Sequence, residues 1–133
     1  MSMKKFYVGV KGIIKEERGY LVLKAVKGHW DIPGGRMDGD ETFEQTLERE
    51  LAEELPGVEV ESINGLRGAH RLQKDIDDDI SLVLLYFLVD AKLPKEVNLS
   101  KEHESYIWVN SLEDLPKKGL DPEITIILTN LLG

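Results

Sequence analysis

Apolar and polar positions alternate at the start of the chain, where Phe6, Val8 and Val10 are spaced two residues apart. A second apolar run covers residues 20–26, and the polar residues 15–19 separate the two runs. A period of two is typical of a strand, and a short polar break between two strands is typical of a turn. We therefore expect the chain to open with a β-hairpin.

The next periodic segment has a helical spacing. Apolar residues recur every four positions from Phe43 to Leu55, and Thr42 stands in capping-box relation to Gln45. This pattern predicts a helix over residues 42–55, ended by a Pro-Gly pair. Just before it, residues 30–35 (WDIPGG) are expected to form a loop, because proline lacks an amide donor and glycine adopts backbone angles that other residues avoid.

Three further segments have the apolar character of strands, namely residues 58–71, 81–89 and 106–109. Residues 81–89 (SLVLLYFLV) are apolar throughout, as in a strand covered on both faces, so we expect them near the centre of the sheet. The charged residues 74–79 and the polar residues 91–104 are expected to be surface loops.

The C-terminal residues have the pattern of a second helix. Asp121 and Pro122 predict its start, and apolar residues at i, i+3, i+4 and i+7 from Ile124 give it one apolar face. Strands and helices therefore alternate, which predicts an α/β fold with helices on a mixed sheet. With 133 residues the chain fits one domain, residues 1–133, with one active site.

The charge of the chain narrows the classes of function. Its 17 basic and 25 acidic residues give a net charge of −8, which repels nucleic-acid backbones and disfavours binding to duplex nucleic acid. A small anionic substrate would bind if divalent cations neutralised a local group of carboxylates. The chain has no cysteine, which excludes disulfides and thiolate zinc sites. The N-terminus resembles neither a signal peptide nor a membrane span, so we expect a cytoplasmic protein without a membrane partner.

Glu50, Glu53 and Glu54 fan over an arc of roughly 100° on the predicted helix. Like charges at these spacings destabilise a helix by roughly 0.2–0.5 kcal/mol per pair, unless a positive charge lies among them. A hard divalent cation with oxygen ligands would supply that charge. Arg49 would pair either with Glu53 along the helix or with Glu41 in the preceding loop. A Glu-rich helix is also typical of a solvated surface, so spacing by itself leaves both interpretations open.

The whole segment from Gly35 to Glu54 (GRMDGDETFEQTLERELAEE) resembles the Nudix box. The family pattern is a glycine, five residues, a glutamate, seven residues, Arg-Glu, an aliphatic residue, any residue and Glu-Glu, followed by any residue, a glycine and an aliphatic residue. Seven specified positions match in register, a far stronger signal than a short motif gives. They are Gly35, Glu41, Arg49, Glu50, Leu51, Glu53 and Glu54.

The sequence departs from the family pattern at the end of the box, where Pro56 stands in the place of the glycine and Gly57 and Val58 follow. A one-residue insertion after the helix would restore the pattern. Because this glycine closes the helix, the departure concerns the geometry of the loop more than the chemistry. The resemblance also includes residues 30–35 and, loosely, residues 102–109, so it covers most of the chain.

The resemblance implies the Nudix α/β/α sandwich around a mixed central β-sheet. It also implies hydrolysis of the pyrophosphate bond in a nucleoside diphosphate linked to another moiety, with Mg²⁺ or Mn²⁺ as cofactor. The implied cation ligands are Glu50, Glu53, Glu54 and the main-chain carbonyl of Gly34.

The resemblance also gives roles to the acidic and basic residues of the box. Either Glu50 or Glu53 would take the proton from the attacking water. Glu41 and Arg49 are expected to be structural supports that hold the loop and the helix together.

Some family members take an additional acid or base from a distant loop, and Glu102, His103 and Glu104 lie in such a position. A solvent-exposed charged loop is the simpler interpretation of these three residues. His70 is interpreted as a structural hydrogen-bonding residue.

Trp30 and Trp108 are interpreted as aromatic residues of the core or of a pocket wall. The acidic residues 75–79 are interpreted as a solvated turn, because they lack the glycine and the terminal glutamate of a calcium-binding loop.

The substrate is only partly indicated. Residues 72–75 lack the proline or tyrosine that marks several substrate subfamilies. The compact chain is similar to small nucleoside triphosphate pyrophosphatases, which release a nucleoside monophosphate and pyrophosphate, and nucleotide sugars stay open. The rival interpretation is a non-catalytic Nudix module that binds a nucleotide or a partner, although such modules commonly lose box carboxylates. Edge strands and the apolar terminal helix leave room for a homodimer.

Overall fold

The computed structural model describes residues 3–133, and their strands form one mixed, seven-stranded sheet. Its main path runs β3-β2-β1-β6-β5, with β4 paired to β1 and β7 paired to β2. Within the described residues, no helix is long and apolar enough to cross a membrane. In chain order the elements are β1 (Lys5–Glu16), β2 (Gly19–Ala25), β3 (Trp30–Asp31), β4 (Gly34–Arg36), α1 (Phe43–Glu54), β5 (Glu59–Arg71), β6 (Ile80–Lys92), β7 (His103–Val109), the 3₁₀ helix η1 (Leu112–Asp114) and α2 (Pro122–Leu132).

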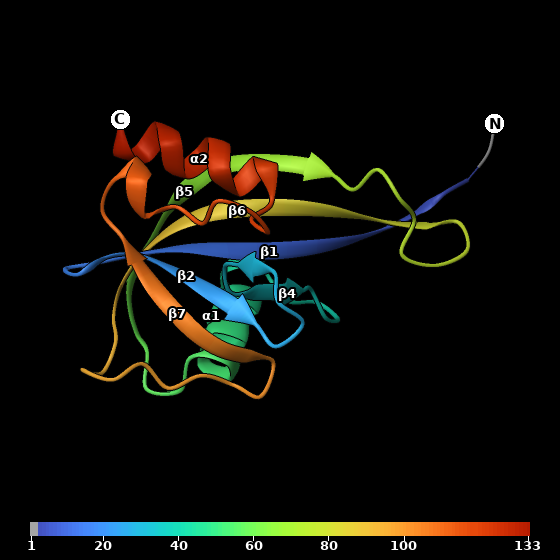
Figure 1. Cartoon of the computed structure of the whole chain (residues 1–133). Helices are drawn as coiled ribbons and strands as arrows, with labels where there is room; N and C mark the ends of the chain where they lie inside the picture. Colours follow the sequence, from blue (N-terminus) through green and yellow to red (C-terminus); the bar gives the residue numbers. More distant parts are fainter. Residues whose placement is uncertain (1–2) are drawn as a thin grey trace.

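The two α-helices cover opposite faces of the sheet, as Figure 1 shows. Successive side chains of a strand point to opposite faces, so β1 and β6 each contribute to two cores. The core on the α1 side includes Val10, Leu47 and Leu51, and the core on the α2 side includes Ile13 and Leu128. The expected α/β/α sandwich around a mixed sheet is therefore confirmed.

The predicted central strand is confirmed and is longer than expected. β6 lies between β1 and β5, in parallel register with β1 and antiparallel register with β5. Phe87 and Val89 are buried on the α1 side, and Tyr86 and Leu88 are buried on the α2 side. This two-sided burial explains the continuous apolar run.

Helix α1 begins and ends where the sequence predicts. The Gln45 amide donates to Thr42 Oγ1 at 3.1 Å, and the Thr42 amide donates to Gln45 Oε1 at 2.9 Å, which completes the expected capping box. Leu55 is the C-cap. Phe43, the first apolar residue of the helical pattern, lies in the first turn, is 41% exposed and packs on Phe87 with the ring centres 5.8 Å apart.

The opening hairpin is shorter than predicted. β1 and β2 pair through only two residue positions, and the turn between them is reduced to residues 17–18. The rest of β1 pairs with β6 on one side and with β4 on the other. Residues 30–35, predicted as a loop, contain β3 and most of β4. The hydrophobic pattern misses β3 because it has only two residues, and β4 because its two glycines contribute no apolar side chain.

Candidate active site

The double glycine of β4 lies directly against β1 and α1. Gly34 has a φ of 153°, and a Cβ there would lie 2.1 Å from the carbonyl oxygen of Val10. A Cβ on Gly35 would lie 2.3 Å from the carboxyl carbon of Glu50. Glycine is therefore required at position 34, and the absence of a side chain at Gly35 lets the Glu50 carboxylate reach the backbone of β4.

The backbone of Gly34 is available to the helix rather than to β1. Gly34 pairs with Lys11, next to the hydrogen bond from the Gly12 amide to the Pro33 carbonyl at 2.8 Å. In an antiparallel ladder, the residue next to such a bond directs its amide and carbonyl away from the partner strand. The Gly34 amide donates to Glu54 Oε2 at 2.7 Å. The carbonyl of Gly34 is likewise left outside the ladder.

Glu54 is a buried carboxylate near the end of α1, with only 9% of its surface exposed. Burial raises the pKa of Glu54 to about 7, although the amide of Gly34 and the charge of Lys11 act in the opposite direction. The negative charge of Glu50 raises this pKa further. The site therefore holds two nearby acidic groups with too little positive charge around them.

Arg49 joins the loop before α1 to the glutamates of the helix. It binds Glu41 through two hydrogen bonds, from Nε at 2.7 Å and from Nη2 at 2.9 Å. These bonds lower the pKa of Glu41 to about 2. Arg49 Nη1 also donates to Glu50 Oε1 at 2.8 Å and lies 3.7 Å from Glu53. Of the two pairings left open by the sequence, that with Glu41 is therefore the closer one.

The three box glutamates do not point in the same direction. Glu50 and Glu54 face the double glycine, whereas the Glu53 side chain is 61% exposed. Within residues 3–133, no three acidic or histidine side chains are already gathered as a cation cage. The carboxylates of Glu50 and Glu54, which both lie at the double glycine, are oxygen donors of the kind that a hard divalent cation such as Mg²⁺ prefers.

A cavity of about 390 Å³ lies on the α2 side of the sheet, next to this site. Lys11 connects the two, because it pairs with Gly34 in register and also lines the cavity. Lys11 Nζ donates to Asp31 Oδ2 at 3.0 Å and to the Ile32 carbonyl at 3.2 Å. The other walls combine Trp30 with His29, Leu82, Leu84, Tyr86, Gly119, Leu120, Asp121 and Ile124.

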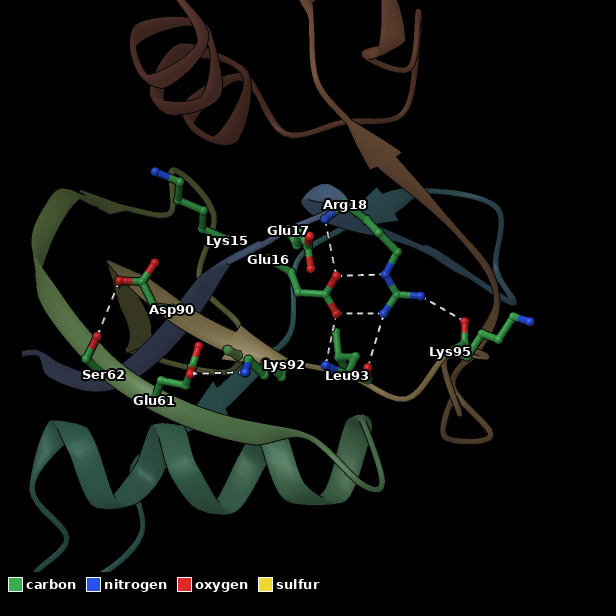
Figure 2. Close-up of a pocket in the computed structure, with 11 residues that line it drawn as sticks. Lys15, Glu16, Glu17, Arg18, Glu61, Ser62, Asp90, Lys92, Leu93 and Lys95 are labelled. Atoms are coloured by element: carbon green, nitrogen blue, oxygen red, sulfur yellow. Dashed lines mark hydrogen bonds and ion pairs between the residues drawn. The ribbon is translucent and has the colours of Figure 1, made fainter.

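A larger cavity of about 830 Å³ lies at the other end of β1, beside the β1–β2 turn (Figure 2). Neither cavity is lined by the double glycine or by a box glutamate, and the larger one is not lined by Lys11 either. Two of its charged residues, Glu16 and Arg18, bind one another. Of the two, the smaller cavity is therefore the candidate substrate cavity, because Lys11 in its wall is the register partner of Gly34.

The three candidates near β7 have different surroundings. Glu104 and His103 are part of β7, and only Glu102 is in the loop, which corrects the predicted loop boundary. The exposed Glu104 lies 3.6 Å from Lys24, as expected for a surface charge. His103 is half-buried, so the exposed-loop interpretation is wrong for it. Burial lowers the pKa of His103, and its Nδ1 is buried without a hydrogen-bond partner among the described residues.

The remaining aromatic residues have the predicted structural roles. His70 stacks on Tyr86, and its Nδ1 lies 3.2 Å from the Tyr86 hydroxyl. Trp30 is a wall of the smaller cavity, and Trp108 packs against the α1-side core.

Lys11 and Asp31 are two residues of this region to which the sequence pattern assigned no role. Their ion pair spans 20 positions along the chain, so no local period reveals it. The available signal is a lysine inside an apolar strand, because such a charge requires a partner. The same argument applies to Asp31, which lies between Trp30 and Ile32.

Comparison with known proteins connects this geometry to a family. The family model described as the NUDIX domain matches residues 5–130. The asymmetrical bis(5'-nucleosyl)-tetraphosphatase of Mus musculus is 31% identical over 93 residues, which are 68% of this chain and 63% of that protein. The 8-oxo-dGTP diphosphatase of Proteus vulgaris is 36% identical over 66 residues, which are 45% of this chain and 57% of that protein. The chain thus spans less than two thirds of the length of these relatives.

Solved structures show the same fold. The MutT NUDIX hydrolase of Burkholderia pseudomallei has a TM-score of 0.75 at 26% identity, over 94% of this chain and 97% of that one. The MutT protein of Methanosarcina mazei Go1 has a TM-score of 0.74 at 24% identity, over 98% of this chain and 95% of that one. The family match extends over almost the whole chain, and Gly35, Glu50 and Glu54 of the box lie together at β4. The chain belongs to the NUDIX family.

Proposed function

We propose that this protein is a divalent-metal-dependent pyrophosphohydrolase that cleaves the pyrophosphate bond in a nucleoside diphosphate linked to another moiety. Its preferred substrate class is a nucleoside triphosphate, which would give a nucleoside monophosphate and pyrophosphate. The names of the relatives support a nucleoside joined to several phosphates, since one is a tetraphosphatase and another a diphosphatase of a modified nucleoside triphosphate.

The observation that carries the proposal is the pair of carboxylates at the double glycine. Glu54 is buried and raised in pKa, and Glu50 presses on Gly35 beside it. A divalent cation held by these carboxylates, Glu53 and the carbonyl of Gly34 would supply the missing positive charge. When bound, the cation neutralises phosphate oxygens and lowers the pKa of a coordinated water.

Glu50 and Glu53 have different surroundings, which favour different roles for them. Glu50 Oε1 accepts from Arg49 and its carboxylate packs on Gly35, so Glu50 is held in place. Glu53 is exposed, with Arg49 at 3.7 Å as its nearest cationic partner. Glu53 is therefore the better general base, because an accessible carboxylate can approach the attacking water and accept its proton.

The cavity beside Lys11 is the proposed site for the nucleoside. It combines the aromatic wall of Trp30 with leucine side chains, which suits a flat heterocycle. Lys11 lies between this cavity and the glutamates, where it would contact the phosphates.

The proposal also assigns partners and location. Mg²⁺ or Mn²⁺ is the proposed cofactor, and small nucleotides in the cytoplasm are the proposed substrates. Duplex nucleic acid and membranes are not proposed as partners, and a homodimer stays a prediction.

The test is phosphate and pyrophosphate release with Mg²⁺ from a panel of nucleoside triphosphates, nucleotide sugars, ADP-ribose and dinucleoside polyphosphates. We expect turnover by the unmodified protein and a loss of at least about 100-fold in kcat for Glu53→Gln, because general-base catalysis contributes about 10²–10⁴-fold. Glu48→Gln is the matched control, since Glu48 is an exposed glutamate of the same helix. Unchanged turnover in Glu53→Gln would refute the role of Glu53. No turnover of any substrate would favour a binding module.

A further inference from the structure

Arg18, in the turn between β1 and β2, holds the start of the loop that connects β6 to β7 (Figure 2). This β6–β7 loop comprises residues 93–102. Arg18 donates to three consecutive carbonyls, those of Lys95 at 2.8 Å, Pro94 at 3.0 Å and Leu93 at 3.2 Å. Glu16 binds Arg18 at 2.6 and 2.7 Å and accepts from the Leu93 amide at 2.9 Å. We call Glu16 and Arg18 the loop clamp.

The clamp is well built for holding a backbone. The Glu16 side chain is only 6% exposed, and the Arg18 guanidinium lies 4.5 Å from the Trp108 ring centre. In residues 3–133, no backbone-to-backbone hydrogen bond involves residues 93–99. The clamp therefore holds the backbone of residues 93–95 through side-chain hydrogen bonds, each of which is charge-assisted.

The other end of the same loop is bound to the proposed cation site. The Ser100 amide donates to the main-chain carbonyl of Glu54 at 3.2 Å, and the Glu102 carbonyl accepts from the Val26 amide at 2.9 Å. Between the two ends, Val97 is buried in the α1-side core. The loop thus connects the clamp to the last residue of α1.

We propose that the loop clamp is a positioning element for catalysis, which acts through residues 93–102 on Glu54. The proposal rests on the proposed function, in which Glu54 is a cation ligand. Glu16 lies five residues beyond Lys11 on β1, a separation of about 17 Å along the strand, so the clamp does not reach a substrate beside Lys11. The Ser100 amide holds the end of α1. Through this contact the clamp fixes the position of the Glu54 carboxylate.

Arg18→Lys in the full chain tests the inference, because lysine keeps the charge but loses the planar set of donors that reach several acceptors at once. We expect kcat with Mg²⁺ to fall about tenfold and KM to stay within about twofold, since the loop contributes no residue to the smaller cavity. Mn²⁺ affinity, measured by calorimetry without nucleotide, should also fall about tenfold. Exchange of the Ser100 amide hydrogen should accelerate.

Arg71→Lys is the matched control. Its guanidinium lies 5.2 Å from the Phe6 ring at the far end of the sheet, away from the loop, so kcat and Mn²⁺ affinity should stay unchanged. If Arg18→Lys does not fold, Glu16→Gln decides with the same measurements: it removes the charge that holds Arg18 in place, so kcat and Mn²⁺ affinity should again fall.

A folded variant with a lower Tm but unchanged kcat and Mn²⁺ affinity would overturn the inference, because the clamp would then serve stability alone. If the unmodified protein turned over no nucleotide, the proposed function would fail. The Mn²⁺ affinities of the unmodified protein and Arg18→Lys would still decide whether the clamp acts on the cation site.

Discussion

At the scale of single residues, Gly35 defines how closely Glu50 approaches the backbone of β4. A Cβ at this position would lie 2.3–2.6 Å from the carboxylate atoms of Glu50. Because those atoms form the end of a flexible side chain, Gly35→Ala should fold and displace Glu50 rather than unfold the protein. We expect kcat to fall at least about 100-fold, since a misplacement of about 1 Å can have an effect of that size.

Gly28→Ala is the contrasting control for this prediction. A Cβ at Gly28 meets nothing within 4 Å, but the φ of 100° is unfavourable for alanine. This variant should lose roughly 1 kcal/mol of stability and keep its kcat. Equal kcat values for Gly35→Ala and the unmodified protein, measured with the same nucleotide and Mg²⁺, would show that the position of Glu50 is not important.

Matching the sequence to the family pattern identified these residues. What surrounds each of them could be seen only in the fold. The spacing of Glu41 and Arg49 predicted a supporting role, and the structure selects Glu41 over Glu53 as the closer partner. The burial of Glu54 depends on how α1 meets β4, which no helical spacing contains. The pairing of Lys11 with Asp31 could not be predicted either, because it joins segments that are distant in the sequence.

At the scale of secondary-structure elements, the loop clamp makes stability depend on pH. The hydrogen bonds from Arg18 are the largest cause that lowers the pKa of Glu16 from 4.5 to about 2. Ionised Glu16 therefore stabilises the folded state fully above the unfolded pKa, and this contribution is lost as pH falls from about 4.5 towards 2. The expected contribution is roughly 2 to 3 kcal/mol.

The measurement is urea unfolding of the unmodified protein and Glu16→Gln between pH 6 and about 2.5. The difference in unfolding free energy between them should be largest near pH 6 and should shrink through this window. Taking the difference removes the carboxylates that titrate equally in both proteins. A difference that stays constant with pH would show that Glu16 is not stabilised in its ionised form.

Elements with a strong local pattern were predicted well. The capping box fixed the start of α1, and the two-sided burial of β6 matched its continuous apolar run. The pairing of β1 with β6 and β4 was not predicted, because a period of two shows that a strand exists but not which strand lies beside it. Short strands rich in glycine, such as β4, have no period to detect.

At the scale of the whole molecule, the net charge of −8 has the same sign as the charge of the proposed substrate. A polyphosphate would be repelled by this charge unless cations were bound first. The fold concentrates negative charge at β4, because it packs Glu50 and Glu54 against the double glycine. Metal binding is therefore the central requirement of the proposed activity.

The most direct test is the rate of nucleotide hydrolysis as a function of Mg²⁺ concentration, for the unmodified protein and Glu54→Gln side by side. For the unmodified protein we expect no turnover in EDTA and a saturable rise in rate with Mg²⁺. For Glu54→Gln we expect a rate lower by about 10–100-fold, or a requirement for about 10–100-fold more Mg²⁺, because a carboxylate ligand is lost. Turnover that persists in EDTA, or identical curves for the two proteins, would contradict these expectations.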